Sequence, residues 1–220
     1  MPLHLLDHDL WFPPVSDALE DGLLAIGGDL STDRLLLAYH SGIFPWFNED
    51  EPPMWWSPDP RFVLFPDELK VSKSMKQVLK SGRFEFRVNT AFEQVINNCK
   101  SVYREGQGGT WIGDDVVDAY IALHKAGYAH SAEAWYNGVL VGGLYGLLLG
   151  KAFFGESMFA HQSNASKFAF INWVGTLQQQ GVQLIDCQVY TEHLESLGAR
   201  MITRDDFIVM VNELTDQAKG

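Results

Sequence analysis

The alternation of polar and apolar positions is sharpest between residues 151 and 190. Residues 151–159 (KAFFGESMF) and 182–190 (VQLIDCQVY) both have the pattern of buried strands. Residues 163–180 lie between them, carry apolar side chains at helical spacing and end before a glycine. The pattern therefore predicts a strand–helix–strand unit, and we expect the rest of the chain to be arranged around it.

Both expected strands carry polar side chains among apolar ones. Because side chains alternate between the two faces of a strand, Asp186 shares a face with Gln188, and Glu156 shares one with Phe154 and Met158. Burying a carboxylate costs several kcal/mol unless it is paired. Two explanations remain open from the pattern alone, namely a hydrogen-bond network that anchors loops and a reaction site.

The remaining pattern predicts an α+β architecture. Turn signals, above all Asn137-Gly138, divide residues 128–159 into a three-stranded meander. For the helix near residue 92 we expect a capping box formed by Thr90 and Glu93. Antiparallel hairpins followed by a strand–helix–strand crossover give a mixed sheet with the two polar strands near its centre. Further elements are expected as a strand and turn over residues 61–70, as strands near residues 83–88 and 199–203, as helices near residues 31–41, 72–82 and 114–126, and as a terminal helix that begins after Thr203.

The start of the chain differs from the rest in composition. We expect residues 1–60 to form a small N-terminal domain and residues 61–220 to form the main domain. The end of the small domain (GIFPWFNEDEPPMWWSPDP) is dense in proline and aromatic residues, which favours an ordered loop. Trp55 and Trp56 fit best a hydrophobic joint between the domains. Trp46 is a better candidate for an exposed surface on which a base stacks.

Charge is distributed unevenly along the chain. The net charge of −12 divides into −10 over residues 1–59, +4 over residues 60–105 and −6 over residues 106–220. A row of cations is often only a solvated helix face, but a basic island in an acidic protein suits a phosphate-binding surface. The island contains one helical face of lysines with an arginine after it: Lys73, Lys76, Lys80 and Arg83.

Several classes of protein and site find no support in the sequence. The first residues lack the basic region and apolar core of a signal peptide, and no apolar run approaches the ~20 residues that span a bilayer. We therefore expect a cytoplasmic protein without membrane contact. Cys99 and Cys187 lack the spacing of a zinc or redox site, and the phosphate-loop, dinucleotide, zinc-protease and serine-hydrolase motifs are missing. We expect neither a metal nor a cofactor.

A series of longer motifs points to one family. In chain order these are GLLAIGGDLS, GIFPWF, WWSPDPR, GTWI, AHSAEAW, LVGGLYG, FFGESMF, NASK and LIDCQ. Together they resemble the leucyl/phenylalanyl-tRNA–protein transferases, from about Gly22 to Asp206. The resemblance implies transfer of Leu or Phe, with Met as a further candidate, from aminoacyl-tRNA to proteins with an N-terminal Arg or Lys, which marks them for degradation. It also implies that the main domain has a fold like the GCN5-related acetyltransferases.

The resemblance also implies roles for individual residues. Asp186 and Gln188 match the pair that is central to peptide-bond formation, and Glu156 matches a third polar residue of the site. Trp46 and Trp111 match aromatic residues that hold the terminal adenosine of the tRNA. The residues that would enclose the aminoacyl side chain in a pocket are Leu144, Met158, Phe170 and Ile185. Ile185 is expected in this pocket although alternation puts it on the opposite strand face from Asp186.

Two other classes of function remain as alternatives. An acyl-CoA-dependent N-acyltransferase would share the fold, but the Q/R-x-x-G-x-G/A loop that binds pyrophosphate is not evident. A non-catalytic tRNA-binding module would use the basic island and the tryptophans, but it would not need Asp186 and Gln188 in a buried strand.

Overall fold

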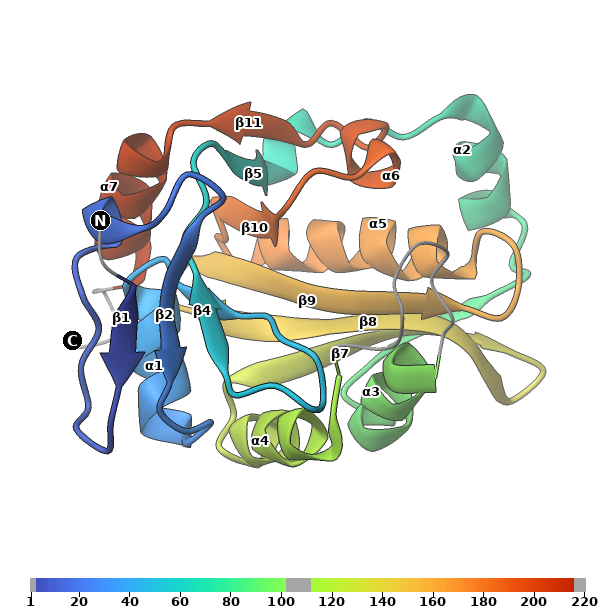
Figure 1. The fold of residues 1–220 in the computed structure, drawn as a ribbon. Helices are drawn as coiled ribbons and strands as arrows, with labels where there is room; N and C mark the ends of the chain where they lie inside the picture. Colours follow the sequence, from blue (N-terminus) through green and yellow to red (C-terminus); the bar gives the residue numbers. More distant parts are fainter. Residues whose placement is uncertain (1–2, 102–111, 216–220) are drawn as a thin grey trace.

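The computed structural model describes residues 3–101 and 112–215, which form two sheets (Figure 1). The smaller sheet has the order β1-β2-β4-β3 and comes entirely from the first part of the chain. Its neighbour, helix α1 (Thr32–His40), begins as expected after Ser31, whose side chain accepts a hydrogen bond from the Arg34 backbone. The strands of this sheet are β1 (His4–Leu6), β2 (Leu23–Gly27), β3 (Phe44–Pro45) and β4 (Met54–Trp56).

The larger sheet has seven strands in the order β11-β5-β10-β9-β8-β7-β6. All of its neighbours pair antiparallel except β9 and β10, which are parallel and are joined by the crossover helix α5. The α+β prediction is confirmed, as are the meander β7–β8–β9 and the central position of the two polar strands. The strands are β5 (Arg61–Leu64), β6 (Glu85–Val88), β7 (Ala129–Tyr136), β8 (Val139–Leu149), β9 (Ala152–Ala160), β10 (Leu184–Gln188) and β11 (Arg200–Ile202).

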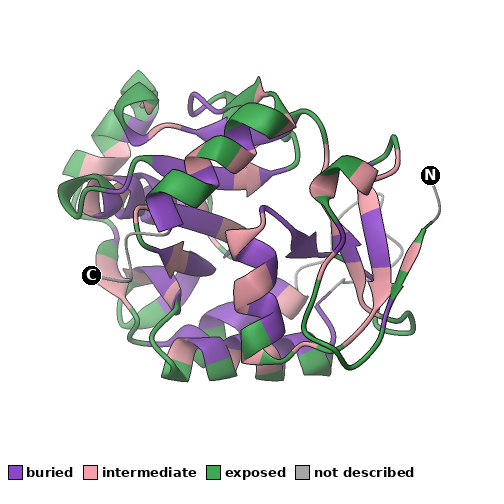
Figure 2. Cartoon of the chain, turned by 90° about the vertical axis from the view of Figure 1, so that its left-hand side faces the viewer, coloured by how far each residue is buried: buried purple, intermediate pink, exposed green. Residues whose placement is uncertain are grey.

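Helices cover both faces of this sheet. Helix α5 packs on one face, and α3 and α4 pack on the other (Figure 1). Burial follows this layering, because the sheet and the inward sides of the helices are buried while their outer sides are exposed (Figure 2). None of the described helices is long and apolar enough to cross a bilayer. The helices beyond α1 are α2 (Lys73–Lys80), α3 (Phe92–Ser101), α4 (Asp114–Lys125), α5 (Ala165–Gln179), α6 (Glu192–Glu195) and α7 (Arg204–Thr215), with short 3-10 helices η1 (Val15–Asp17) and η2 (Pro66–Glu68).

The small sheet shares a continuous apolar core with one face of the large one. That core joins Trp55 and Tyr39 to Phe154 and Tyr145, whereas the opposite face packs separately around α5. Trp55 is fully buried and donates from Nε1 to the carbonyl oxygen of Gly27 at 2.9 Å, as a joint residue should. Burial of this apolar surface stabilises the attachment of the small sheet.

The start of α3 is capped differently from the prediction. Thr90 and Glu93 were expected to form a capping box, but the side chain of Thr90 donates to Glu133 on β7 instead. The same carboxylate accepts from the backbone N–H groups of Thr90 and Ala91, both at 2.9 Å. A carboxylate at a helix N-terminus satisfies unpaired N–H groups and the positive end of the helix dipole. The capping group therefore comes from a neighbouring strand, which local sequence cannot indicate.

Candidate active site

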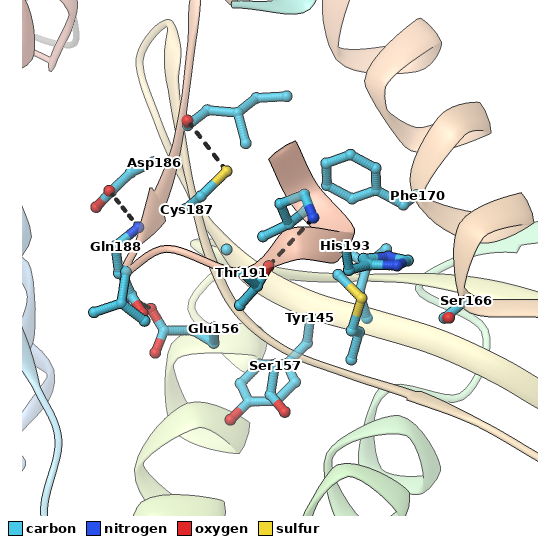
Figure 3. A pocket seen from close by; sticks show the side chains of 16 residues that line it. Tyr145, Glu156, Ser157, Ser166, Phe170, Asp186, Cys187, Gln188, Thr191 and His193 are labelled. Carbon is cyan, nitrogen blue, oxygen red and sulfur yellow. Dashed lines mark hydrogen bonds between the residues drawn. The ribbon is translucent and has the colours of Figure 1, made fainter. Parts of the chain in front are cut away.

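A cavity lies where the two central polar strands separate. β9 and β10 pair only as far as Phe154 and Asp186, and β9 continues beyond that point to Ala160. Between the diverging strands is a cavity of about 430 Å³, closed on one side by α5 and on another by α6 (Figure 3). Its lining is Leu144, Tyr145, Gly155, Glu156, Ser157, Met158, Ser166, Phe170, Ile185, Asp186, Cys187, Gln188, Val189, Thr191, His193 and Leu194.

The cavity brings together most of the residues that the sequence singled out. Its polar end holds Glu156, Asp186 and Gln188, and its other end lies against Phe170 and His193 (Figure 3). All four residues expected around the aminoacyl side chain line it: Leu144, Met158, Phe170 and Ile185. Ile185 lines the cavity together with Asp186 because the cavity lies at the end of β10, where both faces of the strand border it.

The expected alternation fails in β9. Phe154 is buried in the core shared with the small sheet, whereas Met158 packs against the core around α5. Phe154 and Met158 therefore lie on opposite faces of the sheet, although alternation predicted that both would share a face with Glu156. The register against β8 shifts here, since Tyr145 pairs with Ser157 while Gly146 pairs with Gly155. This β-bulge leaves Glu156 without a directly opposed residue and redirects the side chains that follow.

Gln188 also departs from plain strand geometry. Its φ of 64° lies in the left-handed region, and the register between β10 and β5 shifts between Asp186 and Gln188. The backbone N–H of Gln188 donates to Asp186 Oδ1 at 2.9 Å. The expectation that the two side chains project side by side from an extended strand is therefore wrong, because the chain bends at Gln188 and a backbone hydrogen bond links them.

Asp186 is held by a buried arginine that the sequence analysis missed. Arg61 Nε donates to Oδ1 at 2.9 Å and Arg61 Nη2 donates to Oδ2 at 2.7 Å, and both side chains are almost completely buried. The guanidinium lies 4.6 Å from the ring centroid of Phe44 and 4.5 Å from that of Phe207. The signal was an arginine that opens the apolar strand RFVL, since a buried cation needs a buried carboxylate.

Glu156 is surrounded by hydrogen-bond donors. Tyr39 donates to Oε1 at 2.7 Å, Tyr120 donates to Oε2 at 2.9 Å, and Gln188 Nε2 donates to Oε1 at 3.0 Å. The two tyrosine hydroxyls also contact each other. Burial raises the pKa of Glu156 to about 7, against the opposing effect of the tyrosine hydrogen bonds and with a further increase from the charge of Asp186. A carboxyl group with this pKa can gain or lose a proton near neutral pH.

Comparison with known proteins places the chain in a family. The family model described as leucyl/phenylalanyl-tRNA protein transferase matches residues 63–212, and the model for the N-terminal domain of the same proteins matches residues 28–59. The chain belongs to the leucyl/phenylalanyl-tRNA–protein transferase family. This confirms the predicted enzyme class, in which an aminoacyl group passes from tRNA to a protein acceptor.

Curated relatives of this transferase are similar over almost their full length. The leucyl/phenylalanyl-tRNA–protein transferase of Flavobacterium johnsoniae is 57% identical over 206 residues, which cover 94% of this chain and 97% of the relative. That of Chromobacterium violaceum is 56% identical over 204 residues, covering 92% and 87% respectively. A solved GCN5-related N-acetyltransferase-like protein from Streptococcus suis matches at a TM-score of 0.38 and 11% identity, over 81% of this chain and 67% of that one, which is a remote likeness.

The tryptophans expected at the terminal adenosine lie outside the cavity lining or outside the described residues. Trp46 follows β3, is 37% exposed and packs against Trp56, with ring centroids 5.8 Å apart. Trp56 donates from Nε1 to the Trp46 carbonyl oxygen at 2.6 Å. Trp56 is therefore only partly the joint residue that was expected, since it also supports Trp46. Trp111 lies outside the described residues.

The four basic residues expected to bind phosphates lie on and beside α2 of this transferase. Lys73, Lys76 and Lys80 are exposed. Arg83 lies over the rings of Phe84 and Tyr136, and it donates to Gln162 Oε1 at 3.1 Å. Helix α2 packs against α5, the helix that contributes Phe170 to the cavity. Helix α5 therefore contacts the lysine-bearing helix α2 and also lines the cavity.

Proposed function

We propose that the cavity binds the side chain and ester of an aminoacyl-tRNA and that its polar end carries out the transfer. The observation that supports this is the meeting of four apolar residues with Glu156, Asp186 and Gln188 around one space. The donors proposed are Leu and Phe, with Met as a further candidate, and the acceptors are proteins with an N-terminal Arg or Lys, which are thereby marked for degradation. Met158 is flexible enough to suit both branched and aromatic donors.

The orientation of Gln188 follows from its partner. When Glu156 is ionised, its oxygens only accept hydrogen bonds, so the side-chain Nε2 of Gln188 is the group that faces it in that state. The Gln188 Oε1 atom is then the acceptor that remains for an N–H of the incoming amine. An amide is too weakly basic to take the proton itself, so Gln188 orients the amine.

Glu156 is the group that can receive the proton. The acceptor α-amine has a pKa near ~7.7–8.0, and the pKa of Glu156 is raised to about 7, so the two groups are closely matched. The neutral amine attacks the ester carbon, the C–N bond forms, and the bond to the ribose oxygen breaks, with a proton passing to that oxygen. Positioning alone contributes ~7–11 kcal/mol to such a reaction.

Asp186 acts on Gln188 rather than on the amine in this proposal. Both of its oxygens accept from Arg61, and Oδ1 also accepts from the Gln188 backbone. Its carboxylate is therefore occupied within the protein. It is best described as a positioning residue.

The tRNA would contact the protein at two further places. Trp46 and Trp111 are proposed to stack on the terminal adenosine, since exposed aromatic faces hold unpaired bases. Lys73, Lys76, Lys80 and Arg83 are proposed to bind phosphates. The two family matches and the two sheets support a division into a small domain (residues 1–60) and a main domain (residues 61–220). We expect the protein to act in the cytoplasm and without a cofactor.

One experiment separates this function from its alternatives. The protein is incubated with radiolabelled Leu-tRNA, Phe-tRNA, Met-tRNA or acetyl-CoA, together with a peptide that begins with Arg, Lys or Asp. We expect label from Leu-tRNA and Phe-tRNA on the Arg and Lys peptides only. Transfer from acetyl-CoA would indicate an N-acyltransferase, and tRNA binding without any transfer would indicate a binding module.

A further inference from the structure

We propose that Arg61 is a positioning residue of the transfer reaction, because it fixes Gln188 through Asp186. The inference rests on the proposed role of Gln188 in orienting the amine. It assigns a reaction-linked role to a side chain that does not line the cavity, at the end of the chain of contacts Arg61–Asp186–Gln188.

Arg61 and Asp186 form an ion pair with a defined geometry. Nε and Nη2 of Arg61 form two parallel hydrogen bonds with the two oxygens of Asp186, at 2.9 and 2.7 Å. Such a bidentate pair fixes the plane of the carboxylate as well as its position. The orientation of the Asp186 oxygens is therefore set by Arg61.

Asp186 in turn holds the backbone of Gln188. Asp186 Oδ1 accepts from the Gln188 N–H at 2.9 Å, and Gln188 has a φ of 64°. Residues other than glycine adopt this left-handed conformation only where their surroundings hold them in it. The same bend directs the Gln188 side chain towards Glu156, to which it donates at 3.0 Å. A rotation of the Asp186 carboxylate would release the bend and with it the amide.

Arg61 itself is held between two aromatic rings. Its guanidinium is flanked by Phe44 of the small sheet and by Phe207 of α7, at 4.6 and 4.5 Å from the ring centroids. Both rings are buried. Nη1 has no hydrogen-bond partner among the described residues, so the guanidinium is held by one carboxylate and two rings. The attraction between a cation and an aromatic face is larger at a buried site than at an exposed one, so the two rings help to hold the guanidinium in place.

Lysine cannot replace this arrangement. An ammonium group is a compact charge without the planar fork that matches a carboxylate, and it stacks poorly on rings. Arg61→Lys therefore keeps the charge balance of the buried pair while removing the control of carboxylate orientation. It is the variant that separates positioning from charge.

The test compares Arg61→Lys with Arg34→Lys. Arg34 is the matched control, because it is equally buried but donates to the backbone carbonyls of Asp7 and Asp9, away from the cavity. We expect single-turnover transfer per folded molecule to fall by about ten- to a hundredfold in Arg61→Lys, since small misplacements at a reacting centre have effects of this size. We expect KM for the aminoacyl-tRNA to stay unchanged, and we expect Arg34→Lys to lower the melting temperature only.

A double-mutant cycle gives the second readout. If Arg61 acts through Gln188, Arg61→Lys adds little to the defect of Gln188→Ala, whereas Arg34→Lys leaves that defect unchanged. Phe44→Leu removes one ring beside the guanidinium and is expected to slow transfer, though less than Arg61→Lys does. This variant provides the test if Arg61→Lys folds poorly. Normal transfer by folded Arg61→Lys, or full additivity with Gln188→Ala, overturns the inference. Normal transfer by Gln188→Ala itself overturns the proposed function instead.

Discussion

The side chain of Gln188 donates to Glu156 across the opening between β10 and β9, with 3.0 Å between Nε2 and Oε1. The two residues stand on parallel strands that have ceased to pair, each at an irregularity of its strand. Among the described residues, Glu156 is the hydrogen-bond partner of the Gln188 side chain, and this bond fixes which end of the amide is available to a substrate. The roles of both residues can be tested separately.

Replacing Gln188 by Ala is expected to slow transfer strongly while leaving the fold intact. Loss of one orienting hydrogen bond in a site that excludes water costs roughly two to three orders of magnitude in rate. Single-turnover transfer and thermal unfolding should be measured side by side, with Gln183→Ala as the control. Gln183 is exposed just before β10 and outside the cavity. A Gln188→Ala protein with a lower melting temperature and full activity per folded molecule would show that the network is only structural.

Asp186→Asn should affect the same step as Gln188→Ala and should also destabilise the protein. It leaves the buried guanidinium of Arg61 without a counter-charge, and breaking a buried pair in this way typically costs about 3–5 kcal/mol. The double variant with Gln188→Ala is expected to transfer little more slowly than the worse single variant, because the residues act as a unit. If the fold-reduction in rate of the double variant equalled the product of the two single reductions, the residues would not act as a unit.

Glu156→Gln is expected to change how stability depends on pH. Because the pKa of Glu156 is raised from 4.5 to about 7 in the folded protein, the folded state binds this proton more tightly than the unfolded state does. The stabilisation of the folded state by this proton is fully present below about pH 4.5 and is lost as the pH rises towards 7. The melting temperature of Glu156→Gln, relative to wild type, should therefore rise between these values and level off above them.

The same substitution tests the proton-accepting role. Wild-type transfer to a peptide should increase with pH through about 7, as Glu156 ionises. In Glu156→Gln the rate should be low, and the part of the pH dependence near 7 should disappear, leaving only that of the peptide amine. A variant with the wild-type pH profile would exclude Glu156 as the proton acceptor.

Met158→Ala is expected to alter the choice of donor more than the binding of acceptor. Removing an apolar wall affects each donor according to how well it fills the cavity, and such discrimination amounts to ~1–3 kcal/mol. The ratio of the kcat/KM values for Phe-tRNA and Leu-tRNA should shift, while KM for the peptide stays constant. Met201→Ala, on the exposed strand β11, is the control. Equal losses for both donors, accompanied by weaker peptide binding, would contradict the pocket assignment.

Lys73→Glu combined with Lys76→Glu should weaken tRNA binding and flatten its salt dependence. Each lost phosphate contact lowers the slope of log K against log salt by about 0.7 to 0.9. The single variant Lys76→Glu can be compared with Lys125→Glu, which has the same change of charge at an exposed position of helix α4. If the slope were the same in wild type and the double variant, α2 would be a solvated face and not a phosphate-binding surface.

Local pattern was enough to predict the framework of the site but not its irregularities. The meander, the crossover and the central polar strands depend on alternation and turn residues that lie close together in sequence. The bulge at Glu156 and the left-handed Gln188 break that alternation, and nothing in their immediate neighbours marks them. The residues that line the cavity were identified through motifs of the family, since alternation alone would have separated Ile185 from Asp186.

Local sequence pattern could not predict which residues pair with the polar residues of the site. Tyr39 has the spacing of an ordinary core residue of α1, yet its hydroxyl binds Glu156, which is 117 residues away. Arg61 and Asp186 are 125 residues apart. The first pair depends on how α1 packs against the large sheet, and the second depends on the pairing of β5 with β10 within that sheet. A buried carboxylate predicts that a partner exists, but only the fold identifies it.

The strand that carries Arg61 has consequences for synthesis on the ribosome. β5 is made early, but its two neighbours in the sheet, β10 and β11, are made only after more than a hundred further residues, as the 125-residue separation of Arg61 from Asp186 indicates (Figure 1). Phe207, which covers one side of the guanidinium, comes later still. Contacts between such distant segments form late in folding. A nascent chain whose α7 is still inside the exit tunnel therefore has a complete meander but an unfinished reaction site, and activity should begin only after α7 has emerged.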